Sequence, residues 1–435
     1  MKKKIGVIMG GFTPERHISL ESGRNICSKL MASAKYEVVP LFLSGSMSAH
    51  RIFTLPTALL LKDNADDVHD YLLHPYKFSG PTAMLSSIKE KAHAITKIYA
   101  KDAIFHPEEI DYQSLKKIVD FVFIALHGRP GEDGTLQALL EEHDIPYNGS
   151  GIETAALTID KYATSQFLAQ KGFCIAKQLL ITNSKWNSEQ DACMNEIEHH
   201  FDYPMIAKPV DDGCSSGVVK ITHRSSLRAY ASASFRRTQE VPDDLSKQLG
   251  LSTVDFFPQQ ERFLLEAFIK KDASTIACLE TTTGLLTHIG ADGKTLYEIF
   301  EPSEVLAAGS ILSLEEKFLA GEGHNITPAR FCTDSAPYAA ISNIVRAQLE
   351  AIAQTLNLQG YARIDAFVKI YPNQSVEVWV IEVNTLPAMT PATCIFHQAA
   401  LNGYNPFGFI DAIIQYGFTK RNFSTYFSFN FVLNA

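Results

Sequence analysis

Four polar residues near the C-terminal end are spaced so that they could act together. Arg363 and Asp365 are two positions apart in one largely apolar run, and Glu382 and Asn384 are two positions apart in another. Both runs predict β-strands, with residues 371–375 as the turn between them. Because side chains alternate between the faces of a strand, each pair shares one face. The hairpin therefore gathers two carboxylates, an amide and a guanidinium.

This group of side chains is typical of a divalent-cation site beside an anion. Carboxylate and amide oxygens are ligands that Mg²⁺ prefers, and phosphates and water commonly complete its shell. The alternative is an edge hairpin with solvated charges, but such a cluster is costly to bury without a ligand. We therefore predict a metal site with Asp365, Glu382 and Asn384 as ligands.

A glycine- and serine-rich loop at residues 212–217 joins two predicted strands. Its backbone amides could face an anion, and Lys208 on the preceding strand could reach a phosphate. An ordinary glycine–serine turn would explain the same composition, so both interpretations stay open. Cys214 suits a tight turn as a small residue, whereas a nucleophilic cysteine would need a nearby histidine that the sequence does not indicate.

A second candidate loop, residues 127–137, follows the apolar run 121–126. It would lie at the carboxyl end of a strand, where open α/β sheets bind ligands. Its three glycines, histidine, arginine and two acids predict a substrate-positioning loop. Asp133 or Thr135 could also simply cap the helix that begins at Leu136, and the two interpretations are compatible.

Composition limits the class of protein. The 435 residues, 46% hydrophobic and 20% charged, suit about three globular domains. The net charge of −9 argues against nucleic acid or an anionic membrane as a bulk partner. No run approaches the roughly 20 apolar residues of a membrane span, and the first residues lack a signal-peptide pattern. Seven cysteines without metal-site spacing predict free thiols, so we expect a cytoplasmic protein.

The hydrophobic pattern predicts the elements that must position these residues. Strands are expected at 4–9, 38–43 and 121–126, the last central and parallel, with a helix at 15–31. This is a small doubly wound α/β unit, and residues 45–118 are interpreted as an insertion without detectable chemistry.

The rest of the chain predicts two further units. A segment at 297–330 suits a mobile flap. Other elements are expected at 153–171 and 336–356 (helices) and at 205–209, 218–222, 263–268 and 274–280 (strands). The expected domains are 1–150, 151–262 and 263–420, followed by a tail at 421–435 that alternates aromatic and polar residues.

Together, these stretches resemble the D-alanine–D-alanine ligase family of ATP-grasp enzymes. The resemblance covers residues 4–43 and 119–222, and more loosely 261–280 and 355–400. Its specific segments are residues 9–20, 127–137, 148–151, 363–365 and 381–390. It implies a mixed α/β and α+β fold, with a Rossmann-like N-terminal domain and two domains that sandwich ATP.

The resemblance also implies a reaction. The carboxylate of one D-alanine attacks the γ-phosphate of ATP, and the amine of a second D-alanine attacks the resulting acyl phosphate. This step serves peptidoglycan precursor synthesis. The implied partners are ATP, D-alanine and two Mg²⁺ ions, for which Mn²⁺ could substitute, and the implied assembly is a homodimer without nucleic acid or membrane.

The resemblance gives each candidate residue an expected role. Glu15 would bind the substrate ammonium, Arg363 would stabilise an oxyanion, and His127 would support the first substrate. The expected catalytic residues are Glu15, Cys214, Lys317, Phe318 and Arg363. The expected substrate-binding residues are His127, Ala388 and Thr393. The expected ATP-binding residues are Lys161, Lys208, Gly213, Ser215, Ser216, Gly217, Glu266, Phe268, Ile269 and Asp272.

Several positions depart from the usual family pattern. They are Asp211 for an arginine, Cys214 for a serine, Ala273 (beside Asp272) for a ribose-binding glutamate, Phe318 for a flap tyrosine and Ala388 for a glycine. These changes touch the network around the first substrate and leave the metal and phosphate residues intact. Other acceptors, such as D-lactate or another amino acid, therefore stay open, as does a nucleotide-binding protein without turnover. The intact charge cluster argues against the last.

Overall fold

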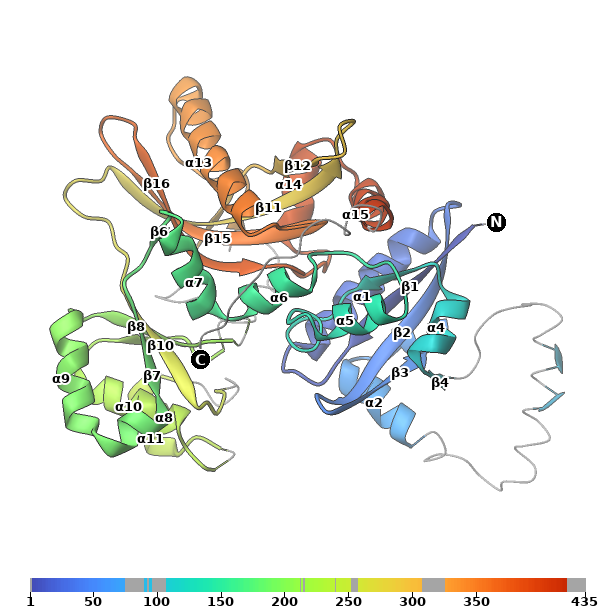
Figure 1. The fold of residues 1–435 in the computed structure, drawn as a ribbon, viewed down its shortest axis with the longest axis horizontal. Helices are drawn as coiled ribbons and strands as arrows, with labels where there is room; N and C mark the ends of the chain where they lie inside the picture. The colour runs from blue at the N-terminus through green and yellow to red at the C-terminus, as the bar shows by residue number, and fades with distance from the viewer. Residues whose placement is uncertain are drawn as a thin grey trace.

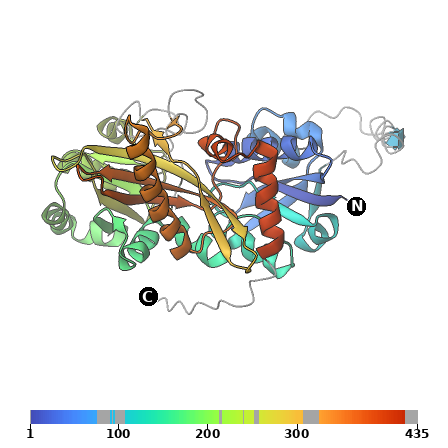
Figure 2. The same cartoon turned by 90° about the horizontal axis from the view of Figure 1, so that it is seen from above.

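The computed structural model describes residues 2–74, 90–91, 94–95, 107–211, 213, 216–238, 240–251, 257–306 and 325–420. These residues form three β-sheets with helices packed on them, arranged along the chain as N-terminal, central and C-terminal units (Figures 1 and 2). No helix in the described ranges has the length and apolar character that crossing a bilayer requires. The tail at 421–435 lies outside the described residues, and the domain boundaries at 150 and 262 stay predictions.

The N-terminal sheet has the strand order β4-β3-β2-β1-β5. Strands β1 (Lys3–Gly10), β2 (Tyr36–Ser46) and β5 (Phe121–Ile124) are parallel, and β3 (Ala49–Thr54) and β4 (Glu108–Ile110) extend the sheet in antiparallel fashion. The segment expected as an insertion therefore contributes two strands to the sheet. Helices α1 (Arg16–Met31), α2 (Ala65–Leu73), α4 (Tyr112–Ile118) and α5 (Thr135–Glu142) share one core with it.

Strand β5 is the last strand of this sheet, so the expectation of a central strand is wrong. Its four residues are nevertheless fully buried. Its outer edge is paired with the segment 146–148, where Val122 N donates to the Pro146 carbonyl at 2.9 Å and Val122 forms a parallel bridge with Tyr147. Helix α15 (Pro406–Lys420) also packs so closely that a Cβ added at Gly417 would lie 2.6 Å from the ring of Phe121. A short bridge and a C-terminal helix thus bury a strand that the sequence pattern shows only as apolar.

The central sheet is antiparallel in the order β7-β10-β8-β9. Its strands are β7 (Gln178–Thr182), β8 (Met205–Pro209), β9 (Val219–Ile221) and β10 (Arg262–Ala267). The helices of this unit are α8 (Asn183–Ser188), α9 (Gln190–His200), α10 (Arg224–Ser234) and α11 (Asp243–Leu249). The loop between β8 and β9 is the predicted phosphate loop.

The C-terminal sheet contains the predicted hairpin, which is confirmed. Strands β15 (Tyr361–Ile370) and β16 (Val376–Asn384) pair next to the long strand β11 (Ala277–Ile289), and helix α13 (Ser335–Thr355) packs on them. The other elements are β6 (Cys174–Ile175), β12 (Thr295–Ile299), β13 (Ser303–Val305), β14 (Asn325–Ile326) and α14 (Cys394–Leu401). Residues 307–324 of the expected flap lie outside the described part.

The single helix expected at 153–171 is wrong, because the chain forms α6 (Ile152–Ile159) and α7 (Lys161–Gln170). At Asp160 the backbone is extended, and its carboxylate accepts hydrogen bonds from Ala163 N at 2.8 Å and Arg262 Nη2 at 2.7 Å. An N-cap of this kind starts a new helix. The break sets Lys161 at the start of α7, where its backbone N–H donates to Val210.

A tight contact at Gly149 joins the N-terminal and C-terminal units. Gly149 has φ +77°, and a Cβ there would lie 2.6 Å from Leu386 Cδ2 and 3.2 Å from the carbonyl oxygen of Thr385. Gly172 also has a positive φ, +87°, but a Cβ there would meet nothing within 4 Å. Alanine substitutions at the two glycines therefore separate the cost of backbone strain, present at both, from the cost of steric crowding, present only at Gly149.

We predict that Gly172→Ala costs about 1 kcal/mol of unfolding free energy, the ordinary penalty of a left-handed alanine. Gly149→Ala should lose about 1–3 kcal/mol more, because the added methyl forces Leu386 or the backbone to move. Urea unfolding of both variants measures the difference. Equal losses would show that the two units do not touch at Gly149 in solution.

Candidate active site

The hairpin brings the four predicted polar residues together. Arg363 faces Asn384, and Asp365 faces Glu382, across β15 and β16. Arg363 donates two hydrogen bonds to the Asp365 carboxylate, at 2.9 and 2.8 Å, and its Nη2 lies 3.7 Å from Glu382 Oε1. Asn384 Nδ2 lies 3.4 Å from the same Glu382 oxygen. These contacts match the expected face of the hairpin.

Two residues from other elements contact the carboxylates of the hairpin, one through its charge and one through a hydrogen bond. Lys161 Nζ lies 3.6 Å from Glu382 Oε2, and Thr282 Oγ1 donates to Asp365 Oδ1 at 2.6 Å. Burial alone would lower the pKa of Arg363, but the Asp365 and Glu382 carboxylates outweigh it and raise that pKa. Arg363 is therefore a fixed positive charge at any physiological pH.

The donor set fits Mg²⁺ only with help from a ligand. Asp365 and Glu382 offer carboxylate oxygens and Asn384 an amide oxygen, all ligands of hard cations. In the described residues no group of three or more His, Cys, Asp and Glu side chains could hold a metal by itself. Phosphate oxygens of a bound nucleotide would have to complete the coordination.

Some candidate ATP-binding residues are buried or half-buried at the central sheet, whereas Asp272 is exposed to solvent. Lys208 is buried, and its Nζ lies 2.8 Å from Glu266 Oε2, whose other oxygen accepts from Gln178 Nε2 at 2.6 Å. Phe268 and Ile269 follow on the strand end and are half-buried, with the Lys220 ammonium 4.4 Å from the Phe268 ring. Asp272 is exposed and instead bonds to Ser274 and Lys369.

The phosphate loop lies against Glu15. A Cβ added at Gly213 would be 2.5 Å from Glu15 Oε1, and one at Gly128 would be 3.0 Å from Oε2. The carboxylate therefore lies between two glycine backbones of different units. Ser216 and Gly217 form the turn that follows: Ser216 N–H donates to Gly213, and the Gly217 carbonyl accepts from Tyr230. Cys214, Ser215, Lys317 and Phe318 lie outside the described residues.

His127 links helix α1 to the loop that follows the hairpin. Its Nδ1 lies 3.2 Å from the carbonyl oxygen of Leu386, and its Nε2 lies 3.0 Å from Ser22 Oγ. Ser22 Oγ in turn accepts from Met389 N at 3.0 Å, and Asn25 Nδ2 donates to Met389 O at 2.8 Å. Burial lowers the pKa of His127 to about 4, with a further contribution from Arg363. The ring is therefore neutral.

The hydrogen bonds also fix the tautomer of this ring. A carbonyl oxygen only accepts, so Nδ1 carries the proton and Nε2 accepts from the Ser22 hydroxyl. Ala388 and Thr393, the expected substrate-binding residues, are buried in and just after the loop held in this way.

Sequence reasoning missed Ser22 and Asn25, and it included Glu132 in the substrate-positioning loop without giving that residue a role of its own. Ser22 and Asn25 are three positions apart on α1 and buried, so a polar stripe on a core-facing helix was the available signal.

Glu132 accepts from Gly128 N at 2.7 Å. Burial, followed by the nearby Glu15 charge, raises the pKa of Glu132 to about 8. Helix α5 begins at Thr135 with Gly134 as its N-cap and no side-chain capping bond, so the expected cap by Asp133 or Thr135 is wrong, although Asp133 accepts from the first helical N–H, Thr135 N, at 3.0 Å.

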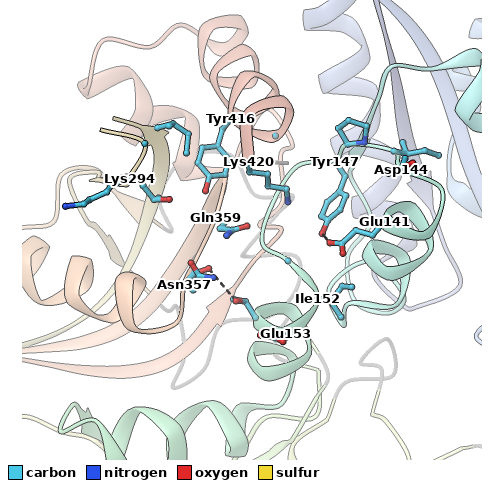
Figure 3. Close-up of a pocket in the computed structure, with 18 residues that line it drawn as sticks. Glu141, Asp144, Tyr147, Ile152, Glu153, Lys294, Asn357, Gln359, Tyr416 and Lys420 are labelled. Carbon is cyan, nitrogen blue, oxygen red and sulfur yellow. Dashed lines mark hydrogen bonds between the residues drawn. The ribbon is translucent and has the colours of Figure 1, made fainter. Parts of the chain in front are cut away.

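A small cavity of about 30 Å³ gathers several of these groups. Its lining includes Gly128, Lys161, Asp211, Gly213 and Glu382. A second cavity, of about 730 Å³, lies between the α5–α6 segment and the end of α15, where Lys420 points towards Tyr147 (Figure 3). None of the predicted site residues that the structure describes lines the larger cavity.

Comparison with known proteins identifies the family. A model for the D-ala D-ala ligase N-terminus matches residues 4–150, and one for the D-ala D-ala ligase C-terminus matches 167–242 and 246–415. The D-alanine–D-alanine ligase of Leptospira interrogans serogroup Icterohaemorrhagiae serovar Lai is 27% identical, covering 96% of this chain and 99% of its own. That of Chlorobaculum tepidum is 24% identical, covering 97% and 98%.

Solved structures agree on the fold. The D-Ala:D-Ser ligase VanG from Enterococcus faecalis has a TM-score of 0.62 and 21% identity, covering 96% of this chain and 100% of its own. The Bacillus anthracis D-alanine–D-alanine ligase complexed with ATP has a TM-score of 0.56 and 21% identity, covering 97% and 98%. The predicted ATP-grasp fold and family are confirmed, and the chain belongs to the D-alanine–D-alanine ligase family.

Proposed function

We propose that this chain uses ATP to join two D-alanine molecules through an acyl phosphate, for peptidoglycan precursor synthesis. The observation that carries the proposal is that one cavity is lined both by the metal-hairpin residues Glu382 and Asn384 and by the two glycines that flank Glu15. Phosphoryl transfer and amino-acid binding need these two sets of groups within reach of each other. The cytoplasm is the expected site of this reaction.

Phosphoryl transfer is mainly a problem of charge and position. We propose that Lys161 and Lys208 bind ATP phosphates, and that Gly213 and Gly217 offer backbone amides to them. Ser216 holds the turn between these two glycines through the hydrogen bond that its N–H donates to Gly213. Asp365, Glu382 and Asn384 would hold Mg²⁺, which when bound neutralises phosphate charge. Glu266 holds the buried Lys208 ammonium at 2.8 Å, so the lysine is oriented before a nucleotide arrives.

The acyl-transfer step builds negative charge on a carbonyl oxygen. Arg363, which stays charged, is the proposed stabiliser of that oxyanion, a role that contributes about 3–4 kcal/mol in other enzymes. His127 is neutral and cannot supply that charge. Because its contact is with Leu386, its proposed role is to hold the loop around Ala388 for the second substrate, rather than to support the first substrate as the resemblance implies.

Glu15 is the proposed partner of the first substrate's ammonium. Glu132 faces the same place, and its pKa of about 8 means that it keeps its proton at neutral pH. Two nearby carboxylates that share one negative charge suit a single ammonium group. The raised pKa is therefore part of substrate recognition in this proposal.

Incubation with ATP, Mg²⁺ and D-alanine should release phosphate and give a dipeptide in mass spectrometry, whereas EDTA or L-alanine in place of D-alanine should give neither. D-lactate and D-serine belong in the same panel, because Phe318 at the flap position leaves a hydroxy-acid acceptor open. Phosphate release that is equal with and without any amino acid would contradict the proposal. The resemblance also implies a homodimer, which light scattering would show as twice the mass of one chain.

Glu382→Gln should lower turnover by at least about a hundredfold, because a lost metal ligand costs several kcal/mol at the transition state and about 1.4 kcal/mol is tenfold. Glu377→Gln is the matched control: it lies on the same strand but bonds to Tyr371 and Trp379. Steady-state phosphate release compares the two variants. A Glu382→Gln enzyme as active as the control would remove Glu382 from the metal site.

Glu132 also gives a pH-dependent prediction for stability. Its folded pKa of about 8 lies above its unfolded value, so the folded state holds the extra proton and stability falls as pH rises from about 4.5 to 8. Glu132→Gln removes that loss and should gain on the parent over this range, by on the order of 3 kcal/mol. Urea unfolding at pH 5 and pH 8 tests it, with the exposed Glu142→Gln as control. A constant difference between parent and Glu132→Gln would show that Glu132 titrates normally.

A further inference from the structure

An ion pair joins two loops at the edge of the catalytic cavity. Arg129 lies in the loop after β5 of the N-terminal unit, and Asp211 lies in the phosphate loop of the central unit. Arg129 Nη1 is 3.0 Å from Asp211 Oδ2, and its Nε is 3.4 Å from Asp133 Oδ2. The side chains of Arg129 and Asp211 are each 34% exposed, so the pair is accessible to solvent.

The backbone on both sides of Asp211 is anchored. The carbonyl of Val210 accepts from Lys161 N at 2.9 Å, and Gly213 is in close contact with the Glu15 carboxylate. Asp211 itself lines the cavity together with Lys161 and Glu382. Its carboxylate is therefore held beside the place where the polyphosphate is proposed to bind.

A carboxylate at this position is unfavourable for a polyanion unless a cation balances it. Like charges a few ångströms apart repel strongly where water is partly excluded. Arg129 supplies this cation, and it belongs to the loop after β5 in the N-terminal unit. Where the family resemblance leads one to expect an arginine at position 211, this chain has an aspartate with the guanidinium supplied across the cleft.

We propose that Arg129 is a positioning residue that neutralises Asp211 and so makes this edge of the cavity compatible with bound ATP. The inference rests on the proposed function, because it requires ATP in this cavity. It predicts that the two residues differ in their effect on ATP affinity. Loss of Arg129 leaves the Asp211 carboxylate uncompensated beside the phosphates and should weaken binding. Loss of the Asp211 charge leaves no such carboxylate and should have little effect.

The experiment is a double-mutant cycle on ATP affinity, measured by calorimetry with Mg²⁺ and no amino acid. Arg129→Ala should weaken ATP binding about fivefold to tenfold, the upper range for a partly exposed charge pair. Asp211→Asn should stay within about twofold of the parent, and adding Asp211→Asn to Arg129→Ala should restore most of the loss. The penalty of Arg129→Ala should also shrink in high salt.

The matched control is Arg51→Ala, which removes an exposed arginine paired with Glu109 on the N-terminal sheet. It should leave ATP affinity unchanged. Thermal melting checks that every variant folds, and Arg129→Lys, which keeps the positive charge, should lose less than Arg129→Ala. If Arg129→Ala binds ATP like the parent, or if the double variant binds no better than Arg129→Ala, the neutralising role is wrong.

Failure of the proposed function would look different. A parent protein that does not bind ATP would overturn the proposed function, and the contact between the loops can still be tested without nucleotide. Hydrogen exchange of the backbone around Asp211 should then be faster in Arg129→Ala than in Arg51→Ala. Equal exchange in the two variants would contradict the ion pair itself.

Discussion

The hydrogen bonds of the buried, uncharged His127 ring are the constraint on which the site depends. The ring accepts a hydrogen bond from the Ser22 hydroxyl of helix α1 and donates one to the Leu386 carbonyl, 259 positions along the chain. Helix α1 begins directly after Glu15, and Leu386 follows directly after the metal hairpin. Two buried hydrogen bonds on one neutral ring thus fix the distance between the proposed ammonium site and the proposed phosphate site.

The charges around the cavity balance one another in different ways. Glu382 is close to Lys161 and Arg363, Asp211 is paired with Arg129, and Glu132 keeps its proton. Each arrangement avoids an uncompensated carboxylate charge, and for the buried carboxyl group of Glu132 that charge would cost several kcal/mol. A protonated His127 would instead add a positive charge near Arg363. The charge of Arg363 already contributes to the lowered pKa of His127.

The sequence predicted the parts of the structure that depend on local pattern. Strand alternation predicted that Arg363 shares a face with Asp365 and that Glu382 shares a face with Asn384. The two pairs lie opposite each other because the register shifts between Asp365 and Ala366, so that Ala366 faces Val380 but Asp365 faces Glu382. Features set by distant contacts were missed or wrong. Strand β5 is buried by the segment 146–148 and by α15 rather than by a further strand, and the Asp160 carboxylate at the helix break accepts from Arg262, 102 positions along the chain. Likewise, no local sequence pattern around Ser22 indicates that Leu386 and Met389 belong to the same hydrogen-bond network.

The most direct test of this account is ¹⁵N NMR of the His127 side chain between pH 5.5 and 8, assigned by the signal that Asn substitution at this position removes. The account predicts a ring that does not titrate in this range, with the proton on Nδ1, because its pKa is about 4. A ring that takes up a proton near the ordinary histidine pKa of about 6.5, or that carries its proton on Nε2, would contradict it.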